Sequence, residues 1–307
     1  MKYVITADWH LREDRPVCRN DVDWIETQSV AVASVFSYAK DVGAEVIING
    51  DIFHRPTTAP TLVSIFLSAV HQFGAPVYIL PGNHDLPYHS FNHLNKSSFG
   101  ILREVMDIGG TNLFDSSRKA AVVDFGQLED KVYGTKSDLL CLHQLAFPSL
   151  KDMPPNEQGI LAEDLCYRFP GVKWILVGDN HKHFCYQGGT QRVVNPGCLL
   201  SQASDLIDYV SGFYLIDTAS DSVEFVPTKD IGTVSEDHVV KEKDRVGRIG
   251  AFVEALEKSK VLGLDIVLNL MRGLPALRIP TADVVKELIN EVRGLNEVGY
   301  PKNDDER

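Results

Sequence analysis

The chain has 307 residues, of which 44% are hydrophobic and 23% charged, and its formal net charge is −12 at pH 7. This composition is typical of a globular protein, and the length allows one large α/β domain with an appendage or two domains. The negative charge argues against a broad basic surface that binds nucleic acid tightly by itself. It does not exclude DNA chemistry, because bound divalent cations or a partner subunit can supply positive charge.

The cysteines and the start of the chain indicate the cellular compartment. The five cysteines are scattered and form no Cys-x-x-Cys pair, which indicates reduced packing residues and argues against disulfides or a zinc ribbon. No run of about 18 apolar residues occurs, and the first residues enter an apolar strand without the pattern of a signal peptide. We therefore expect a cytoplasmic protein that does not associate with membranes.

The first predicted elements are a strand, a loop and a helix. The apolar run 2–6 predicts a buried strand. The polar loop that follows carries Arg12, Arg15 and Arg19. It is either a solvated connection or a segment that meets phosphates at a functional site. Apolar residues at helical spacing predict a helix over 26–42, closed by a glycine as a C-cap.

Two more strands and a second helix continue this βαβ pattern. Strands are predicted over 45–49 and 77–80, with a helix from about residue 57 to residue 73 between them. The segment 86–107 is aromatic and then amphipathic. This pattern favours core packing but also fits a homodimer contact or a wall of a substrate site.

The second half of the chain is richer in strands. Residues 120–125 and 131–133 predict a hairpin. Five further strands are predicted at 139–142, 174–177, 192–194, 212–216 and 222–226. We therefore expect an α/β fold in which two sheets form a β-sandwich flanked by helices.

The composition changes from about residue 230. The remaining pieces are a charged connector at 241–248, a short helix at 249–258, an apolar run at 261–270 and an amphipathic helix at 281–295. We expect a domain of residues 1–230 and a small, mainly helical C-terminal region of residues 231–307.

Side chains that bind metal ions follow five of the predicted strands. Loops at the carboxyl ends of strands in an α/β sheet present their side chains at one edge. The side chains concerned are Asp8, His10, Asp51, His54, Asn83, His84, Asp85, His143, Asp179, His181 and His183. A single aspartate after a strand is more often a turn former or a helix cap, but five such strand ends in succession favour a metal site. Asp51, central in the series, is our candidate for a carboxylate that bridges two cations.

This motif series resembles that of the calcineurin-like metallophosphoesterases, which carry Asp-x-His, Gly-Asp, Gly-Asn-His, a lone His and Gly-His-x-His. The resemblance spans roughly residues 1–227. Within that superfamily, DWHL at 8–11 and GDIFHR at 50–55 look like the SbcD-type nuclease subunits of double-strand-break repair complexes. The segments NPGC at 195–198 and GFYLID at 212–217 are also similar to that group.

The resemblance implies the metallophosphoesterase fold and two divalent metal ions. One ion would be held by Asp8, His10, Asp51 and the last histidine of the series. The second would be held by Asp51, Asn83, His143 and the penultimate ligand.

The resemblance also implies two histidines that act on the substrate. His84 would meet the scissile phosphate and protonate the leaving oxygen, and His54 would be a second histidine that positions the phosphate. An imidazole suits this work because its unperturbed pKa, about 6.5, leaves both protonation states accessible.

The last motif departs from the family pattern. Where the family has Gly-His-x-His, this chain has GDNHKH at 178–183. In the direct register Asp179 and His181 are the ligand pair, and His183 is then a surface residue; shifted by two, His181 and His183 are the pair. We favour the direct register, because it keeps the glycine at the strand end and supplies an oxygen ligand. The extra carboxylate favours manganese or magnesium over softer metals.

We therefore expect a two-metal phosphodiesterase that acts on DNA as an exonuclease and endonuclease in repair or recombination. The resemblance implies an SMC-like ATPase partner that docks on the C-terminal helices. One alternative is a stand-alone phosphatase or a phosphodiesterase of small molecules or cyclic nucleotides, which the acidic charge and short C-terminal region favour. The other is a non-catalytic binding module, for which loss of ligands would be expected and only the exchange at Asp179 is a sign.

Overall fold

In a computed structural model, the structure describes residues 1–108, 120–123 and 138–235. Two five-stranded sheets dominate this part of the chain. The first has the strand order β12-β11-β1-β2-β3, in which β1 to β3 run parallel and β11 and β12 are antiparallel. Its strands are β1 (Lys2–Thr6), β2 (Glu45–Asn49), β3 (Val77–Leu80), β11 (Gly212–Asp217) and β12 (Ser222–Pro227).

The second sheet has the order β4-β5-β8-β10-β9, with only β9 antiparallel to its neighbour. Its strands are β4 (Ala120–Val123), β5 (Leu139–Leu142), β8 (Trp174–Leu176), β9 (Phe184–Gly188) and β10 (Gln191–Asn195). A small parallel pair is made by β6 (Ala146–Phe147) and β7 (Ile160–Leu161).

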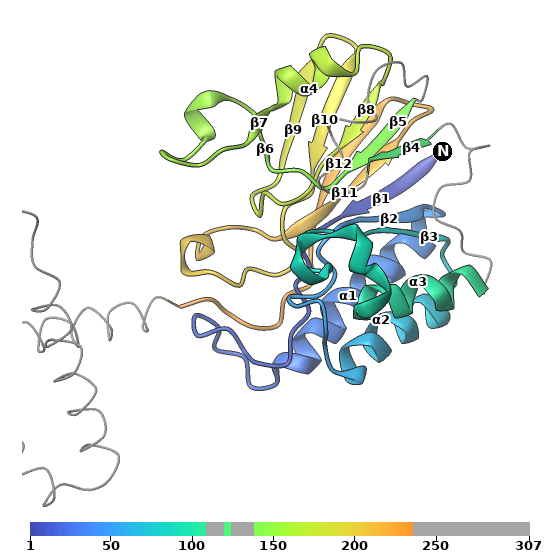
Figure 1. The fold of residues 1–307 in the computed structure, drawn as a ribbon, viewed down its shortest axis with the longest axis vertical. Coiled ribbons are helices and arrows are strands. Elements are labelled where there is room, and N and C mark those ends of the chain that lie inside the picture. The colour runs from blue at the N-terminus through green and yellow to red at the C-terminus, as the bar shows by residue number, and fades with distance from the viewer. Residues whose placement is uncertain (109–119, 124–137, 236–307) are drawn as a thin grey trace, which may run out of the picture. The chain divides into compact units, whose positions relative to one another are not determined.

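Helices cover the outer face of each sheet (Figure 1). The first sheet carries α1 (Trp24–Val42), α2 (Pro60–Phe73) and α3 (Ser98–Ile108), and the second carries α4 (Ala162–Arg168). Asp23 caps α1 by accepting the N–H of Glu26 at 3.0 Å, and Gly43 ends it in the left-handed conformation. Short 3-10 turns lie at Pro87–His89, Phe91–Lys96, Leu150–Asp152 and Ser204–Leu206.

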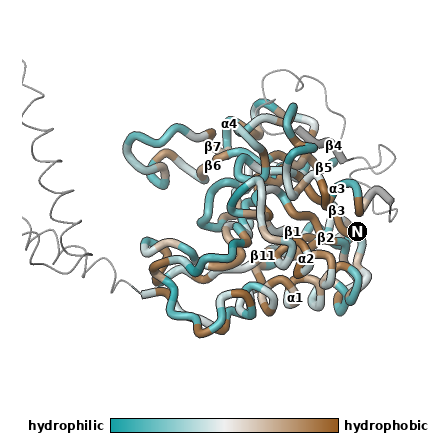
Figure 2. The backbone as a smooth tube through the Cα atoms, turned by 60° about the horizontal axis from the view of Figure 1, so that its bottom comes forward, coloured by the Kyte–Doolittle hydropathy of each residue, from teal (hydrophilic) through white to brown (hydrophobic). Residues whose placement is uncertain are grey.

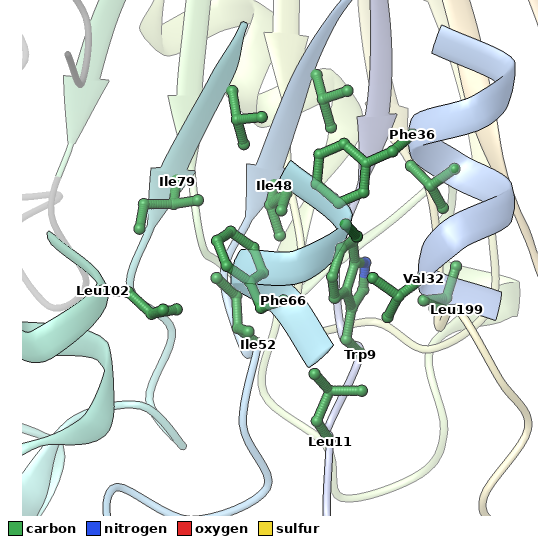
Figure 3. Close-up of a cluster of buried hydrophobic side chains, with 14 of the residues drawn as sticks. Trp9, Leu11, Val32, Phe36, Ile48, Ile52, Phe66, Ile79, Leu102 and Leu199 are labelled. Atoms are coloured by element: carbon green, nitrogen blue, oxygen red, sulfur yellow. The ribbon is translucent and has the colours of Figure 1, made fainter. Parts of the chain in front are cut away.

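Each strand of β1, β2 and β3 is buried on both faces. Alternate residues such as Val46 and Ile48 pack against the helices, while Ile47 between them faces the other sheet. Figure 3 shows the helix-side core, where Trp9 lies among side chains that include Phe36 and Phe66. The Trp9 indole N–H donates to the Thr6 hydroxyl at 2.7 Å, so this residue anchors the loop that follows β1.

A second apolar layer joins the two sheets, and a third lies under α4. Ile5 and Leu80 of the first sheet meet Cys141 and Trp174 of the second. Figure 2 shows the hydropathy of each residue along the chain, with many hydrophobic residues on the central strands and many hydrophilic residues on the loops around them. Among the described residues, no helix combines the length and apolar content of a membrane span.

The predicted fold class, two sheets flanked by helices, is confirmed. Several bounds differ from the prediction: α1 begins at Trp24, because Asp23 is its cap, and α2 begins at Pro60, which fits the first turn of a helix. The alternating, half-exposed edge strand β9 was not predicted.

Two predictions meet the limits of the described residues. The second strand of the predicted hairpin, 131–133, lies outside them, and the described partner of β4 is the parallel strand β5. The C-terminal region also lies outside them beyond residue 235, so the predicted domain boundary stays a prediction. In the segment 86–107, Leu94, Phe99 and Leu102 are buried in the core, and the homodimer contact likewise stays a prediction.

Candidate metal centre

The loops after β1 and β2 stay paired beyond the ends of their strands. The Asp8 N–H donates to the Gly50 carbonyl at 3.1 Å, and the His10 N–H donates to the Asp51 carbonyl at 3.0 Å. The two loops therefore hold their polar side chains side by side at the carboxyl edge of the sheet.

The backbone of four of these residues adopts a positive φ. The angles are 51° at Asp8, 44° at His10, 54° at Asp51 and 72° at Asp179. Non-glycine residues adopt this left-handed conformation rarely, at a cost of about 1–3 kcal/mol each, and mostly where surrounding structure enforces it. Its recurrence at the strand ends indicates that the scaffold fixes the direction of these side chains.

Two glycines leave the space that the site needs. A Cβ at Gly50 would collide with the His143 ring, and a Cβ at Gly82 would collide with the carboxylate of Asp51. Close approach thus explains the glycine that precedes each of these two motifs.

The two carboxylate oxygens of Asp51 face different partners. Oδ1 accepts the backbone N–H of His84 at 2.9 Å. Oδ2 lies 3.7 Å from Nε2 of His10 and 3.4 Å from Nε2 of His143. Asp51 is therefore oriented by one oxygen and presents the other between two histidines.

His143 is held in a single ring orientation. Its Nδ1–H donates to the Asn49 carbonyl at 2.7 Å, which leaves Nε2 as the nitrogen that faces the site. Nε2 lies 3.2 Å from Oδ1 of Asn83 and 4.0 Å from a carboxylate oxygen of both Asp8 and Asp179. Groups from the ends of β1, β2, β3 and β8 thus converge on this ring, which itself follows β5.

A second convergence involves His10 and His181. Their Nε2 atoms lie 3.1 Å apart. When both rings are neutral, at least one of these two nitrogens carries a lone pair in place of a proton. Oδ2 of Asp8 and Nδ1 of His10 are buried without a hydrogen-bond partner among the described residues. Orphaned acceptors of this kind are costly unless a cation or water satisfies them.

The donors gather in sets suited to metal ions. Three sets have ligand atoms within 4.8 Å of one another: Asp8, His10 and His181; Asp8, Asp51 and His143; and His10, His54 and His84. Carboxylate, carboxamide and imidazole donors suit borderline and hard divalent cations. The orphaned Asp8 oxygen and the facing histidine nitrogens show that the residues fit such cations.

The pKa directions reflect the crowding of charged groups. Burial raises the pKa of Asp8 well above its usual value, and the nearby Asp51 and Asp179 add to the rise. Burial acts to lower the pKa of His143, but Asp51, Asp8 and Asp179 outweigh it and raise the pKa to about 10. Burial lowers the pKa of His10, with partial compensation by Asp51. The site therefore concentrates negative charge that a divalent cation would neutralise.

His84 and His54 lie beside these groups, as stacked rings with centroids 5.5 Å apart. The Nδ1–H of His84 donates to the His54 carbonyl at 2.9 Å, so its Nε2 is free for other contacts. The His84 ring is also 4.7 Å from that of His10, measured between centroids. Both histidines are half-buried.

The residues of the last motif lie in different surroundings. His181 lies in the site, whereas His183 stacks on Phe225 with ring centroids 3.9 Å apart. Nδ1 of His183 is 3.1 Å from the Tyr214 hydroxyl. Asp179 faces His143, and its N–H donates to Oδ1 of Asp8 at 3.1 Å. The structure therefore brings Asp179 and His181 to the other candidate ligands and places His183 against Phe225 and Tyr214, while the ligand pair itself stays a prediction.

Asp85 supports the site in a way that sequence reasoning missed. Its buried carboxylate accepts the backbone N–H groups of Ile52 at 3.2 Å, Phe53 at 2.9 Å and Gly82 at 3.0 Å. It thus ties the loop after β2 to the loop after β3. Burial and the charge of Asp51 raise the pKa of Asp85 to about 7, against the three N–H groups. The only signal in the sequence was its place directly after His84.

Two strand-end asparagines also support the site. The Asn49 side chain donates to the carbonyls of Leu142 and Leu176 at 2.8 and 3.1 Å, which joins the two sheets beneath His143. The Asn195 side chain donates to the carbonyls of Asn180 and Lys182 at 2.6 and 2.9 Å, which shapes the loop that carries His181.

Comparisons with known proteins give a family and a set of similar folds. A family model described as calcineurin-like phosphoesterase matches residues 1–190, more than half of the chain. One similar solved structure is TT1561 of Thermus thermophilus, with 14% identity and a TM-score of 0.46 over 74% of this chain and 98% of that one. A dimetal phosphatase from Danio rerio has 9% identity and a TM-score of 0.48 over 76% of this chain and 98% of its own. An archaeal phosphodiesterase has 14% identity and a TM-score of 0.42 over 74% of this chain and 99% of its own. No curated protein sequence matches the chain.

Proposed function

Because the chain belongs to the calcineurin-like phosphoesterase family, we propose that it is a two-metal phosphodiesterase that hydrolyses DNA, as an exonuclease and endonuclease of repair or recombination. Family membership implies a metal-dependent hydrolase, and the geometry supports a two-metal site. The DNA substrate is inferred from the SbcD-type resemblance of residues 8–11 and 50–55. The observation that carries the proposal is Oδ2 of Asp51, which faces His10 and His143 as a bridging carboxylate would.

The donor groups divide between two cations. We assign Asp8, His10, Asp51 and His181 to one of them. We assign Asp51, Asn83, His143 and Asp179 to the other. Manganese is the proposed native metal, with magnesium as the alternative, because oxygen ligands predominate over soft ones. When bound, such cations stabilise the negative charge of the transition state and lower the pKa of the attacking water.

The protein's own contribution to the reaction centres on His84. The His54 carbonyl holds its Nδ1–H, so Nε2 is the atom that exchanges a proton with the leaving 3′ oxygen. His54, stacked beside it, orients the phosphate. Trp9 and Asp85 keep the three surrounding loops in register, which holds the reacting groups in place.

Digestion of linear double- and single-stranded DNA in the presence of Mn²⁺ tests this proposal. We expect wild-type protein to degrade DNA and His84→Ala to lose about two or more orders of magnitude in rate, with its metal content intact. His71→Ala is a matched control, because this exposed histidine of α2 is remote in sequence from every motif. Equal degradation of DNA by His84→Ala and wild type would contradict the proposed role.

A second candidate is a phosphodiesterase of small molecules or cyclic nucleotides. A groove of about 620 Å³ adjoins the site at Asp179 and His181, and its other lining residues include Asp152, Glu157 and Asp205. This acidic groove fits a small leaving group better than it fits a polyanion. Hydrolysis of bis-p-nitrophenyl phosphate or a cyclic nucleotide by a protein that leaves DNA intact would favour this candidate.

The partner proposal depends on the SbcD-type resemblance. We propose that the C-terminal region of residues 231–307, nearly all of it outside the described residues, docks an SMC-like ATPase. ATP-dependent stimulation of DNA cleavage when such an ATPase is added would support a nuclease subunit. A rate that is independent of any ATPase would favour a stand-alone enzyme.

A further inference from the structure

Three arginines lie on the loop between β1 and α1, and the structure gives them different surroundings. Arg19 is buried and forms ion pairs with Asp21 and Asp230, both at 2.7 Å. The guanidinium of Arg15 donates to the Asp21 carbonyl. Both are therefore occupied by contacts that hold the fold. Arg12 stands in a different environment, next to the metal centre.

Backbone pairing places Arg12 beside His54. Leu11 forms a parallel bridge with Phe53, and its carbonyl accepts the His54 N–H at 3.1 Å. Arg12 follows Leu11 and His54 follows Phe53, so the two residues lie next to each other where this pairing ends. Gln28 of α1 fixes the position, since its side chain accepts the Arg12 N–H at 2.8 Å and donates to the Arg12 carbonyl at 2.9 Å.

The Arg12 side chain has unused hydrogen-bonding capacity. It is 18% exposed, and its Nε is buried with no acceptor among the described residues. The guanidinium of Arg12 forms an ion pair with Asp14, whose side chain is 60% exposed. An unpaired buried N–H is unfavourable, so a ligand that supplies an acceptor is favoured. A guanidinium binds a phosphate well because it offers two parallel N–H groups.

The two sides of the centre differ in charge. Arg12 and the exposed Arg55 both flank His54, so positive charge gathers on this side. On the groove side of the centre, by contrast, Lys182 lies 3.8 Å from Asp205, and Asp152 and Glu157 line the same surface. A polyanionic strand would therefore cross the centre on the arginine side.

We propose that Arg12 and Arg55, which flank His54, form a second anion subsite beside the metal centre, which binds the phosphate next to the scissile one in a nucleotide strand. This inference rests on the proposed phosphodiesterase function and adds a substrate preference to it. A substrate with two neighbouring phosphates gains contacts that a single diester lacks. The subsite thereby distinguishes a polynucleotide from a small diester.

A pair of small ligands that differ by one phosphate tests the subsite without DNA. Calorimetry on the full chain in Mn²⁺ compares thymidine 3′,5′-bisphosphate with thymidine 5′-monophosphate and thymidine 3′-monophosphate. We expect wild-type protein to bind the bisphosphate at least about tenfold more tightly than either monophosphate. Tenfold is the lower end of the effect expected from one charge-assisted hydrogen bond. Arg12→Gln should remove most of this preference, and Arg55→Gln should reduce it.

Arg15→Gln is the matched control, since Arg15 belongs to the same loop but donates to a backbone carbonyl. It should keep the preference for the bisphosphate. Thermal melting verifies that each variant is folded, and the Gln28 contacts, which involve only the Arg12 main chain, should survive Arg12→Gln. Absence of the preference in wild type, its persistence in Arg12→Gln or its loss in Arg15→Gln would overturn the inference.

Turnover separates the subsite from the proposed function. On a single-stranded oligonucleotide, Arg12→Gln should raise KM by a larger factor than it does on bis-p-nitrophenyl phosphate. The slope of log affinity against log salt concentration should fall by about 0.7, as for one lost phosphate contact on a single strand. If wild type does not hydrolyse DNA but prefers the bisphosphate, the DNA proposal fails and the subsite stands. If it hydrolyses DNA with equal affinity for the mono- and bisphosphates, the subsite fails alone.

Discussion

At the residue scale, Asp51 is the side chain on which the two-metal hypothesis depends most directly. One oxygen is fixed by the His84 N–H, and the other is shared between His10 and His143. An asparagine in its place would lose the charge and present its N–H₂ group either to the two histidines or to the His84 N–H.

We expect Asp51→Asn to lose both cations, because the bridging carboxylate contributes to both positions. His143→Gln should lose mainly one of the two cations. Elemental analysis of the purified proteins after dialysis against Mn²⁺ measures this, with about two ions per chain expected for wild type. Retention of one full equivalent by Asp51→Asn would show that its carboxylate does not bridge.

The last motif gives a second prediction at this scale. His181→Ala should lose metal and activity, whereas His183→Phe should keep both. His183 stacks on Phe225 and contacts the Tyr214 hydroxyl, so a phenylalanine preserves the stacking and gives up one contact, worth about 1 kcal/mol of stability. Metal content and melting temperature of the two variants test this prediction. Metal loss in His183→Phe as well as in His181→Ala would favour the shifted register, in which these two histidines are the ligand pair.

The ligand types were predictable from the sequence, and the direct register of the last motif was favoured but not fixed by it. Strand ends in an α/β sheet gather at one edge, so residues from Asp8 to His143 were expected together. In the last motif, spacing allowed His181 to pair with either Asp179 or His183. The difference comes from Tyr214 and Phe225, which β11 and β12 bring against His183 from a distant part of the chain.

At the element scale, Asp85 joins the loops after β2 and β3. Asp85→Ala should leave three buried N–H groups without an acceptor and lower the free energy of unfolding by several kcal/mol, at about 1–3 kcal/mol per group. Asp85→Asn should lower the free energy of unfolding by less, because the amide oxygen of asparagine can still accept some of these N–H groups. Urea unfolding of the metal-free proteins measures the difference. Equal stability of Asp85→Ala and wild type would show that water replaces the carboxylate.

The strands that carry the site were the most predictable elements. Runs such as 45–49 and 139–142 are apolar throughout because both of their faces are buried, and the sequence pattern records this directly. The edge strand β9 gave no comparable signal, since its residues alternate between buried and exposed and it follows the last motif without a turn. The Tyr88 and His89 turn, with positive φ at both residues, also had no pattern in the sequence.

At the scale of the whole molecule, Arg19 joins three distant parts of the chain. It pairs with Asp21 on its own loop and Asp230 after β12, and donates to the Ser201 carbonyl at 3.2 Å. The segment after β12 also returns to this loop, where Arg19 bridges with Val234. This long-range arrangement could not be predicted, because neither Asp230 nor Ser201 belongs to a recognisable motif.

The Arg19 cluster predicts a dependence of stability on pH. Burial acts to raise the pKa of Asp21, but Arg19 and Thr27 outweigh it, so the pKa lies below its usual value. A lowered folded-state pKa contributes stability that is present above the unfolded pKa, about 3.9, and is lost as the pH falls through the folded value. Asp21→Asn should therefore be less stable than wild type at pH 7, with the gap closing below about pH 4.

Urea unfolding at pH 7, 5 and 3 measures this gap. Asp230→Asn offers a comparison, because Arg19 keeps Asp21 in that variant; we expect a smaller loss of about 1–2 kcal/mol for this partly exposed partner. A gap between Asp21→Asn and wild type that stays constant from pH 7 to pH 3 would show that the packing of Asp21, not its charge, stabilises the fold.

The left-handed backbone at Asp8, Asp51 and Asp179 also limits how this protein can lose its activity during evolution. Aspartate, asparagine and glycine tolerate that conformation, whereas β-branched residues do not. Lineages that abandon catalysis are therefore expected to drift to asparagine or glycine at these three positions, because such changes leave the scaffold intact. A descendant with those residues would keep the same loops at the same sheet edge, free to be selected for binding alone.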